Sequence, residues 1–311
     1  MGGKFRVVGK DHFLRKGWGG RFKDMDNNSN TFFSPPPLSI GNHIVTINKP
    51  TIMGIVNITP DSFSDGGLYL DHNKAFEHAL KLEKDGADII DIGGESTRPG
   101  ANPISLNEEE NRILPVIQEI RKKSNIPISV DTTKAEIAKK AIMLGANMIN
   151  DISAGTFDPD MFKVAAKAEV PICIMHIKGN PKHMQDNPTY ADIIEEIKDY
   201  FKTAINRATL AGISPDKLII DPGIGFGKTA EDNIKILQNI SKFRIFNKHI
   251  LIGTSNKSFI GAMLNLNVKE RLEPTLATIL YAFQQGTSIF RVHDVLATKK
   301  FLSMVEILEK S

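Results

Sequence analysis

The sequence predicts a single α/β domain, a closed (β/α)8 barrel, preceded by an N-terminal extension. From residue 51 onward, short β-branched or apolar runs alternate with longer amphipathic patterns, as strands alternate with helices in such a fold. Eight of these units follow one another at about 30 residues each, which favours a closed barrel over an open doubly wound sheet. The length of 311 residues suits one barrel with an extension.

The first part of the chain differs from the rest in composition. Residues 1–40 are rich in Gly, Asn, Lys and Arg and end in a run of Ser34 and three prolines, which favours extended polyproline structure. We therefore expect a flexible N-terminal extension over residues 1–40 and a catalytic barrel over residues 41–311. A turn and short strand at residues 41–47 are expected to form a lid over the bottom of the barrel.

The expected strands are apolar at consecutive positions, as strands buried on both faces are. Gly-Ala-Asp at 86–88 and Gly-Ala-Asn at 145–147 each end a helix and start the next strand. The expected strands cover residues 51–56, 88–92, 127–131, 147–151, 171–175, 217–221, 249–253 and 288–292. Helical patterns include residues 74–84, 108–123, 134–144, 193–211, 276–285 and 295–309.

Composition excludes several classes of protein. A net charge of +3 is nearly balanced and does not favour a nucleic-acid partner. The sequence shows neither an apolar stretch long enough to span a membrane nor an apolar segment behind its basic N-terminus, so we expect a cytoplasmic protein. The single cysteine, Cys173, excludes an internal disulfide, and its apolar neighbours indicate a buried strand residue rather than a nucleophile.

Polar residues stand where the expected strands end. In a TIM barrel these ends converge on one mouth, which holds the active site. A single Asp or Asn there can instead cap the next helix, and for Asp151 both interpretations remain open. The whole set needs partners at the mouth. It comprises Asn57, Asp91, Asp131, Asn150 with Asp151, His176, Asp221, Thr254 with Ser255, and Arg291 with His293.

The residue types suggest two kinds of ligand group. Asp131, Asn150 and Asp221 could read the polar edge of a pterin, as carboxylates and amides read base edges. Lys257 could donate to the same ring, and the planar guanidinium of Arg291 could stack on it. Donors suited to phosphate come from Asn57, Arg98, Arg291 and His293, and Mg²⁺ could bind Asn57 with a water held by Asp65.

Three loops carry further signals. Residues 59–67 and 93–100 are polar and Gly-bounded, which favours lids over a substrate rather than ordinary exposed loops. Residues 221–229 end in the Gly-Lys-Thr of a phosphate-binding loop. The position of that motif's first glycine holds Pro222, so we reject a P-loop.

Taken together, these segments resemble the dihydropteroate synthase family. The resemblance runs from residue 51 to the C-terminus, in the family's order. It is carried by residues 53–67, 91–100, 129–132, 149–151, 175–181, 221–228, 258–261 and 291–294. The first two segments and the loop that starts at Asp221 are the most specific.

The resemblance implies an enzyme that joins p-aminobenzoate to a dihydropterin pyrophosphate in folate biosynthesis, with Mg²⁺ as cofactor. It also implies a homodimer that sulfonamide drugs target. Asp131, Asn150, Asp221 and Lys257 match pterin-binding positions, and Arg291 the residue that stacks on the pterin and helps to hold phosphate. Asn57 matches the metal ligand; Arg98 and His293 match pyrophosphate contacts; Phe63, Pro99, Phe226 and Ser258 match the p-aminobenzoate pocket. Thr97 is expected to bind substrate, and Asp65, Arg98 and Lys257 to act in catalysis.

One residue departs from the family pattern: Asn256 stands where the family usually has Arg, directly before the pterin lysine. This puts the local charge balance in doubt. Two alternatives are a methyltetrahydrofolate-dependent methyltransferase and a degenerate barrel kept for binding. The first should not combine the loop around Arg98 with Lys257, Arg291 and His293, and the second should have lost this constellation.

Overall fold

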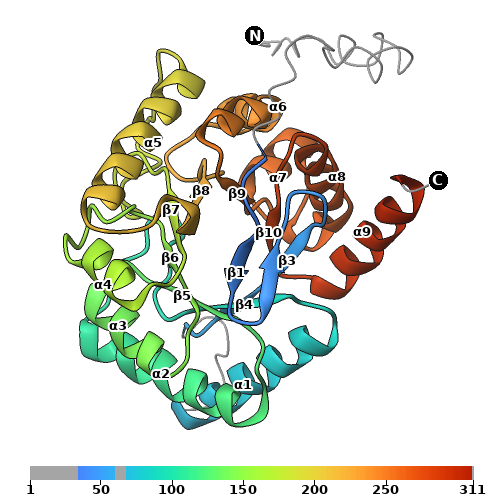
Figure 1. The fold of residues 1–311 in the computed structure, drawn as a ribbon. Helices are drawn as coiled ribbons and strands as arrows, with labels where there is room; N and C mark the ends of the chain where they lie inside the picture. The colour runs from blue at the N-terminus through green and yellow to red at the C-terminus, as the bar shows by residue number, and fades with distance from the viewer. Residues whose placement is uncertain (1–33, 60–67, 310–311) are drawn as a thin grey trace, which may run out of the picture. The chain divides into compact units, whose positions relative to one another are not determined.

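The computed structural model describes residues 34–59 and 68–309. Within them, eight parallel strands close into a barrel in the order β10-β3-β4-β5-β6-β7-β8-β9, and helices surround it (Figure 1). The predicted (β/α)8 TIM barrel is therefore confirmed. The strands are β3 (Thr51–Asn57), β4 (Ile89–Gly93), β5 (Ile128–Asp131), β6 (Met148–Asp151), β7 (Ile172–Met175), β8 (Leu218–Asp221), β9 (His249–Ile252) and β10 (Ile289–Val292).

The helices follow the strands in turn. They are α1 (Leu68–Lys84), α2 (Leu106–Lys123), α3 (Ala135–Met143), α4 (Met161–Ala168), α5 (Ile193–Leu210), α6 (Ala230–Gln238), α7 (Ser258–Leu264), α8 (Leu272–Gln284) and α9 (Val295–Glu309). Short 3-10 helices cover Pro215–Lys217, Ile240–Phe246 and Val268–Glu270. The predicted helix at 74–84 starts six residues earlier, and the one at 276–285 starts four residues earlier.

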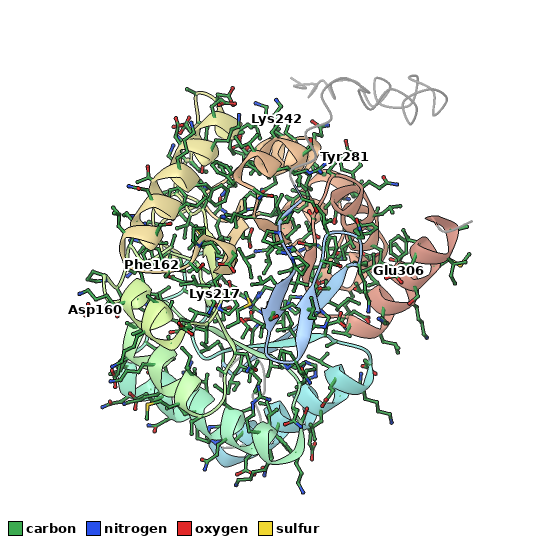
Figure 2. The ribbon with its side chains drawn as sticks, in the orientation of Figure 1. Asp160, Phe162, Lys217, Lys242, Tyr281 and Glu306 are labelled. Atoms are coloured by element: carbon green, nitrogen blue, oxygen red, sulfur yellow. The ribbon has the colours of Figure 1, made fainter. Side chains whose placement is uncertain are left out.

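The main core lies between the barrel and the helices, where side chains fill the layer (Figure 2). Outward-facing strand residues such as Ile90 and Ile92 share one buried cluster with Ile113 and Ile117 of α2. The barrel closes where β10 pairs with β3, with Ile289 opposite Thr51. Consecutive apolar residues on the strands are thus explained by burial on both faces.

A short hairpin closes the floor of the barrel. Strands β1 (Leu38–Ile40) and β2 (His43–Val45) pair antiparallel. Leu38, Ile40 and Val45 share a second buried cluster with side chains that the barrel strands turn inward. The inward residues of that cluster are Met53, Ile89, Met148, Cys173, Ile219, Leu251 and Ile289. The expected lid over the bottom and the buried position of Cys173 are confirmed.

The hairpin also shows that the barrel domain starts earlier in the chain than expected from the sequence. Residues 38–40 fall within the stretch that the sequence assigned to the extension, yet the compact unit begins at Ser34. His249 Nε2 lies 3.0 Å from the carbonyl oxygen of Pro36, which ties the proline run to β9. The boundary at residue 40 was therefore too late, because Leu38 and Ile40 supply apolar surface that the barrel floor needs. The expected flexibility of residues 1–33 concerns positions outside the described residues.

None of the helices in the described part of the chain is both long and apolar enough to cross a membrane.

The floor hairpin offers a matched test of its contribution to stability. Ile40 is fully buried, whereas Ile44, on the same hairpin, is 58% exposed. We expect Ile40→Ala to lower the free energy of unfolding by about 2–5 kcal/mol, since it leaves a cavity in the floor. Ile44→Ala should change it by less than about 0.5 kcal/mol. Urea denaturation of both variants measures the difference, and equal losses would mean that the hairpin does not seal the barrel.

Candidate active site

The predicted polar residues gather at the carboxyl ends of the barrel strands, around Arg291 of β10. The Arg291 guanidinium donates from Nε to Asp91 Oδ2 and from Nη2 to Asp131 Oδ2, both at 2.6 Å. Asn150 Nδ2 donates to the same Asp91 oxygen at 3.1 Å. These four residues come from β10, β4, β5 and β6, so barrel closure alone brings them together.

The charged groups at this mouth shift one another's pKa values. Burial lowers the pKa of Arg291, but the carboxylates of Asp91 and Asp131 outweigh it and hold the pKa above its ordinary value. Burial raises the pKa of Asp131 to about 7 against the opposing effect of Arg291, with Asp91 adding to the rise. Arg291 therefore stays charged, and Asp131 can bind or release a proton near neutral pH.

The sequence named Asp91 as a strand-end residue but gave it no role. Its side chain is fully buried, while that of Arg291 keeps 22% exposure. Asp91 therefore orients Arg291 and Asn150 from the buried interior of the barrel, and part of the Arg291 side chain remains exposed for contact with a ligand. Asp91 Oδ1 has no hydrogen-bond partner among the described residues. The sequence signal for this role was a single charged residue in an otherwise apolar strand, Ile89–Gly93.

A second group lies on the β8 and β9 side of the mouth. Lys257, which precedes α7, places its Nζ 4.2 Å from the centre of the Phe226 ring. Burial and the charge of Arg291 lower the pKa of Lys257 to about 8. Asp221 ends β8 and accepts a hydrogen bond from Gly223 N at 2.7 Å, and burial raises its pKa to about 6. A carboxyl and an amine with near-neutral pKa values thus belong to one site.

His293 follows β10 and is held by Ser255. Its Nδ1 lies 3.0 Å from Ser255 Oγ, which also accepts from the His293 backbone N–H at 3.2 Å. Burial, followed by the charges of Arg291, Lys257 and Arg98, lowers the pKa of His293 to about 4. His293 is therefore neutral at physiological pH and can offer a single N–H to an anion.

The predicted lid residues after β4 lie at the rim. Thr97 is half-buried, and Arg98 and Pro99 are exposed. The loop base is fixed: Lys134 contacts Glu95 and also Glu109, the latter at 2.5 Å. The effect of Arg98 on the pKa of His293 places its charge within range of the mouth.

Other predictions have mixed outcomes. Asn57 ends β3, half-exposed, and Ser258 is exposed at the start of α7. Phe63 and Asp65 lie outside the described residues. Asp151 accepts from Ser153 N, Ser153 Oγ and Gly155 N, all within 2.8 Å, so it holds its own turn rather than a ligand. No group of three or more His, Cys, Asp or Glu residues in the described ranges could hold a metal ion.

Asn256 fits its backbone. Its φ is +60°, in the left-handed region, which Asn adopts more readily than Arg does. Its carbonyl accepts from Arg271 Nη1 at 3.1 Å, which fixes the chain directly before Lys257. Asn256 thus carries no positive charge where the family usually has Arg, but the backbone contact that positions the chain before Lys257 is present.

The shifted pKa of Asp131 predicts a pH-dependent stability. The folded-state pKa is about 7 and the ordinary value is 3.8, so between these pH values the folded protein keeps a proton that the unfolded chain has lost. The free energy of unfolding should therefore fall as pH rises from about 4 to about 7. Asp131→Asn should reduce that fall by roughly 3–4 kcal/mol, since each pKa unit corresponds to about 1.4 kcal/mol.

Urea denaturation of the unliganded protein at several pH values across this range measures the effect. Asp199→Asn, at an exposed position on α5, is the control and should leave the pH dependence unchanged. An identical fall in the wild type and in Asp131→Asn would refute the raised pKa.

Comparison with known proteins agrees with this geometry. A family model described as pterin binding enzyme matches residues 53–293. The dihydropteroate synthase of Synechocystis sp. is 45% identical over 278 residues, which cover 89% of this chain and 96% of that protein. The enzyme of Escherichia coli (strain K12) is 44% identical over 260 residues, covering 84% and 92%.

Solved structures agree as well. The Yersinia pestis dihydropteroate synthase, in a sulfonamide drug complex, has a TM-score of 0.83 at 39% identity, covering 89% of this chain and all of that one. The Xanthomonas albilineans dihydropteroate synthase with 4-aminobenzoic acid has a TM-score of 0.83 at 38% identity, covering 89% and 99%. Similarity of this extent, along nearly the whole described chain, shows that the protein belongs to the dihydropteroate synthase family of pterin-binding enzymes.

Proposed function

We propose that this protein is a dihydropteroate synthase of folate biosynthesis. It condenses 6-hydroxymethyl-7,8-dihydropterin pyrophosphate with p-aminobenzoate to give 7,8-dihydropteroate and pyrophosphate. The observation that carries the proposal is the buried set at the barrel mouth, in which Arg291 bridges Asp91 and Asp131 beside Asn150. Such a set suits a flat heterocycle with donors along one edge and a cationic transition state.

The pterin would bind against this set. Asp131 and Asp221 offer carboxyl oxygens to ring N–H and amino groups, and Asn150 offers an amide. Lys257 donates to the oxo group or a ring nitrogen, and the exposed face of Arg291 stacks on the ring. As the bond between the methylene carbon and the pyrophosphate oxygen breaks, the two carboxylates stabilise positive charge on the pterin.

The leaving pyrophosphate would meet donors at the rim. Arg98 can bind phosphate oxygens in a bidentate manner, and neutral His293 adds one N–H. Asn57 offers an oxygen of the kind that Mg²⁺ prefers, and a site with few protein ligands fits an ion held mainly by pyrophosphate oxygens. When bound, Mg²⁺ would neutralise charge on the leaving group.

The second substrate would enter beside Phe226. The Xanthomonas albilineans relative is solved with 4-aminobenzoic acid, and the Yersinia pestis relative with a sulfonamide drug complex. By analogy, Phe226, Pro99 and Ser258 line a p-aminobenzoate pocket that also takes sulfonamides, with Phe63 and Thr97 contributing. The neutral aromatic amine attacks the methylene carbon as pyrophosphate leaves, and the new C–N bond forms before the nitrogen loses its proton. No strong general base is required.

Pyrophosphate release tests this function directly. Purified protein with dihydropterin pyrophosphate and Mg²⁺ should release pyrophosphate and form dihydropteroate only when p-aminobenzoate is added. Leaving out Mg²⁺ should lower the rate. Lys257→Ala or Asp131→Ala should lower kcat/KM by about 100-fold or more, since each removes a charge at the reacting centre.

Lys269→Ala is the matched control, because Lys269 is an exposed cation twelve residues from Lys257. It should keep wild-type turnover. Full turnover in both Lys257→Ala and Asp131→Ala would refute the assigned roles. A folded wild type that releases no pyrophosphate would favour the degenerate barrel.

We also propose a homodimer that packs through helices α8 and α9. These neighbouring helices expose apolar side chains: Tyr281 is 47% exposed, Met304 51% and Leu308 65%. Tyr281 and, beside this patch, Glu306 are labelled in Figure 2 on the same side of the molecule. Apolar side chains on adjacent helices suit a self-complementary interface between two copies.

Substitution at this surface should separate the copies. We expect Tyr281→Glu combined with Met304→Glu to convert a dimer to a monomer in sedimentation velocity, because each carboxylate would be buried unpaired at the interface. Leu210→Glu is the control: Leu210 is 80% exposed on α5 and should leave the dimer intact. A monomeric wild type, or dissociation caused by Leu210→Glu alone, would contradict this interface.

A further inference from the structure

Lys228 is a buried cation to which neither the sequence nor the proposed reaction gives a role. It lies in the loop between β8 and α6, in the Gly-Lys-Thr run that resembles a phosphate-binding loop. Its side chain is almost fully buried, with 3% exposure. A phosphate-binding lysine would present its ammonium to a ligand, so this lysine serves another purpose.

Its ammonium meets three acceptors of the protein. Nζ lies 2.9 Å from the carbonyl oxygen of Phe226, 3.2 Å from that of His176 and 3.0 Å from His176 Nδ1. Burial lowers the pKa of Lys228 to about 7, and in its charged form the ammonium has three protons and no acceptor, so these three groups match its capacity. Burial and the charge of Lys228 lower the pKa of His176 to about 2, so this imidazole is neutral and Nδ1 can accept.

These contacts join two loops of the mouth. His176 follows β7, and Phe226 lies in the loop after β8, 50 residues further along the chain. Two other side chains of the β7 loop also bind the β8 loop. Gln185 Nε2 donates to the Gly225 carbonyl at 2.8 Å, and Tyr190 Oη donates to that of Gly227 at 2.6 Å.

The two loops also approach more closely than most residues allow. A Cβ on Gly223 would lie 2.0 Å from the His176 carbonyl oxygen, and one on Gly227 would lie 2.5 Å from that of Lys178. Both glycines have positive φ. Lys228 therefore holds together two backbones that already lie in contact, and its loss would leave buried carbonyls unpaired.

The contacts between the β7 and β8 loops also position the side chain of Phe226. Phe226 packs beside a cluster of Ile152, Met175, Ile177 and Met184, and its ring faces the Lys257 ammonium. Since Lys228 binds the Phe226 carbonyl directly, it sets where this ring lies relative to Lys257. The pterin contacts Asp131 and Asn150 come from other strands and do not depend on this loop. Asp221, where the loop starts, is held by the backbone N–H of Gly223 at 2.7 Å, and the hydrogen bonds of Lys228 go to His176 and Phe226 instead.

We propose that Lys228 is a positioning residue, which clamps the β7 and β8 loops together and so shapes the p-aminobenzoate pocket rather than the pterin site. This inference rests on the proposed function for the identity of the second substrate. The clamp itself follows from the contacts alone.

The kinetic test compares the two substrates. Lys228→Met keeps the length of the side chain and removes its donors. It should raise KM for p-aminobenzoate about tenfold or more, through the loss of the carbonyl contacts, while KM for dihydropterin pyrophosphate stays within about twofold. Lys235→Met, at an exposed position on α6, should change neither value. Equal increases in both KM values, or a fall in kcat alone, would overturn the assignment to the p-aminobenzoate pocket.

Amide hydrogen exchange tests the clamp independently of the reaction. Residues 222–229 should exchange faster in Lys228→Met and at the wild-type rate in Lys235→Met. Unchanged exchange would overturn the clamp even if the enzyme is active. A wild type without turnover would instead refute the proposed function, and the exchange result would still decide the clamp. If Lys228→Met fails to fold, Tyr190→Phe removes the outer bond to Gly227 and should show the same changes at smaller size; wild-type exchange and KM values in Tyr190→Phe would then reject the clamp.

Discussion

The bridge that Arg291 makes between Asp91 and Asp131 is the interaction on which the rest of the mouth depends. Two carboxylates buried side by side are costly unless a cation lies between them, and removal of that cation would leave both unpaired. The arrangement also fixes geometry. Asp91 accepts from Arg291 and Asn150 through one oxygen, so a single fully buried carboxylate aligns side chains from β10 and β6.

The loops on the two sides of the mouth are held by different kinds of contact. On one side, the loops after β7 and β8 lie in backbone contact, with glycines at the closest approaches. On the β4 side, the following loop is held at its base, where Lys134 binds Glu95, and at Gly100, whose N–H donates to the Pro181 carbonyl at 3.0 Å; Arg98 and Pro99 between these points are exposed. The loops after β4 and β8 are therefore both tied to the loop after β7, which connects the two sides of the mouth.

The sequence predicted the barrel well because strand burial and helix periodicity are local patterns. It predicted which residues reach the mouth, since every strand end of a TIM barrel points there. It assigned Asp131 to the ligand, but it left Asp151 open between a ligand contact and a cap. Both end a strand, but one faces Arg291 and the other binds its own turn. Asp91 and Lys228 were missed as functional residues for a related reason. The partner of Asp91 lies 200 residues away and that of Lys228 lies 52 away, and no local pattern records such pairings.

The floor hairpin has a consequence for how the chain folds as it is made. Leu38, Ile40 and Val45 leave the ribosome before any barrel strand, yet their buried neighbours extend to Ile289 of the last strand. The bond between Pro36 and His249 spans 213 positions. Contacts of such sequence separation form slowly, because the long loop between the partners must close first. The burial of these three side chains is thus completed only when nearly the whole chain has been synthesised.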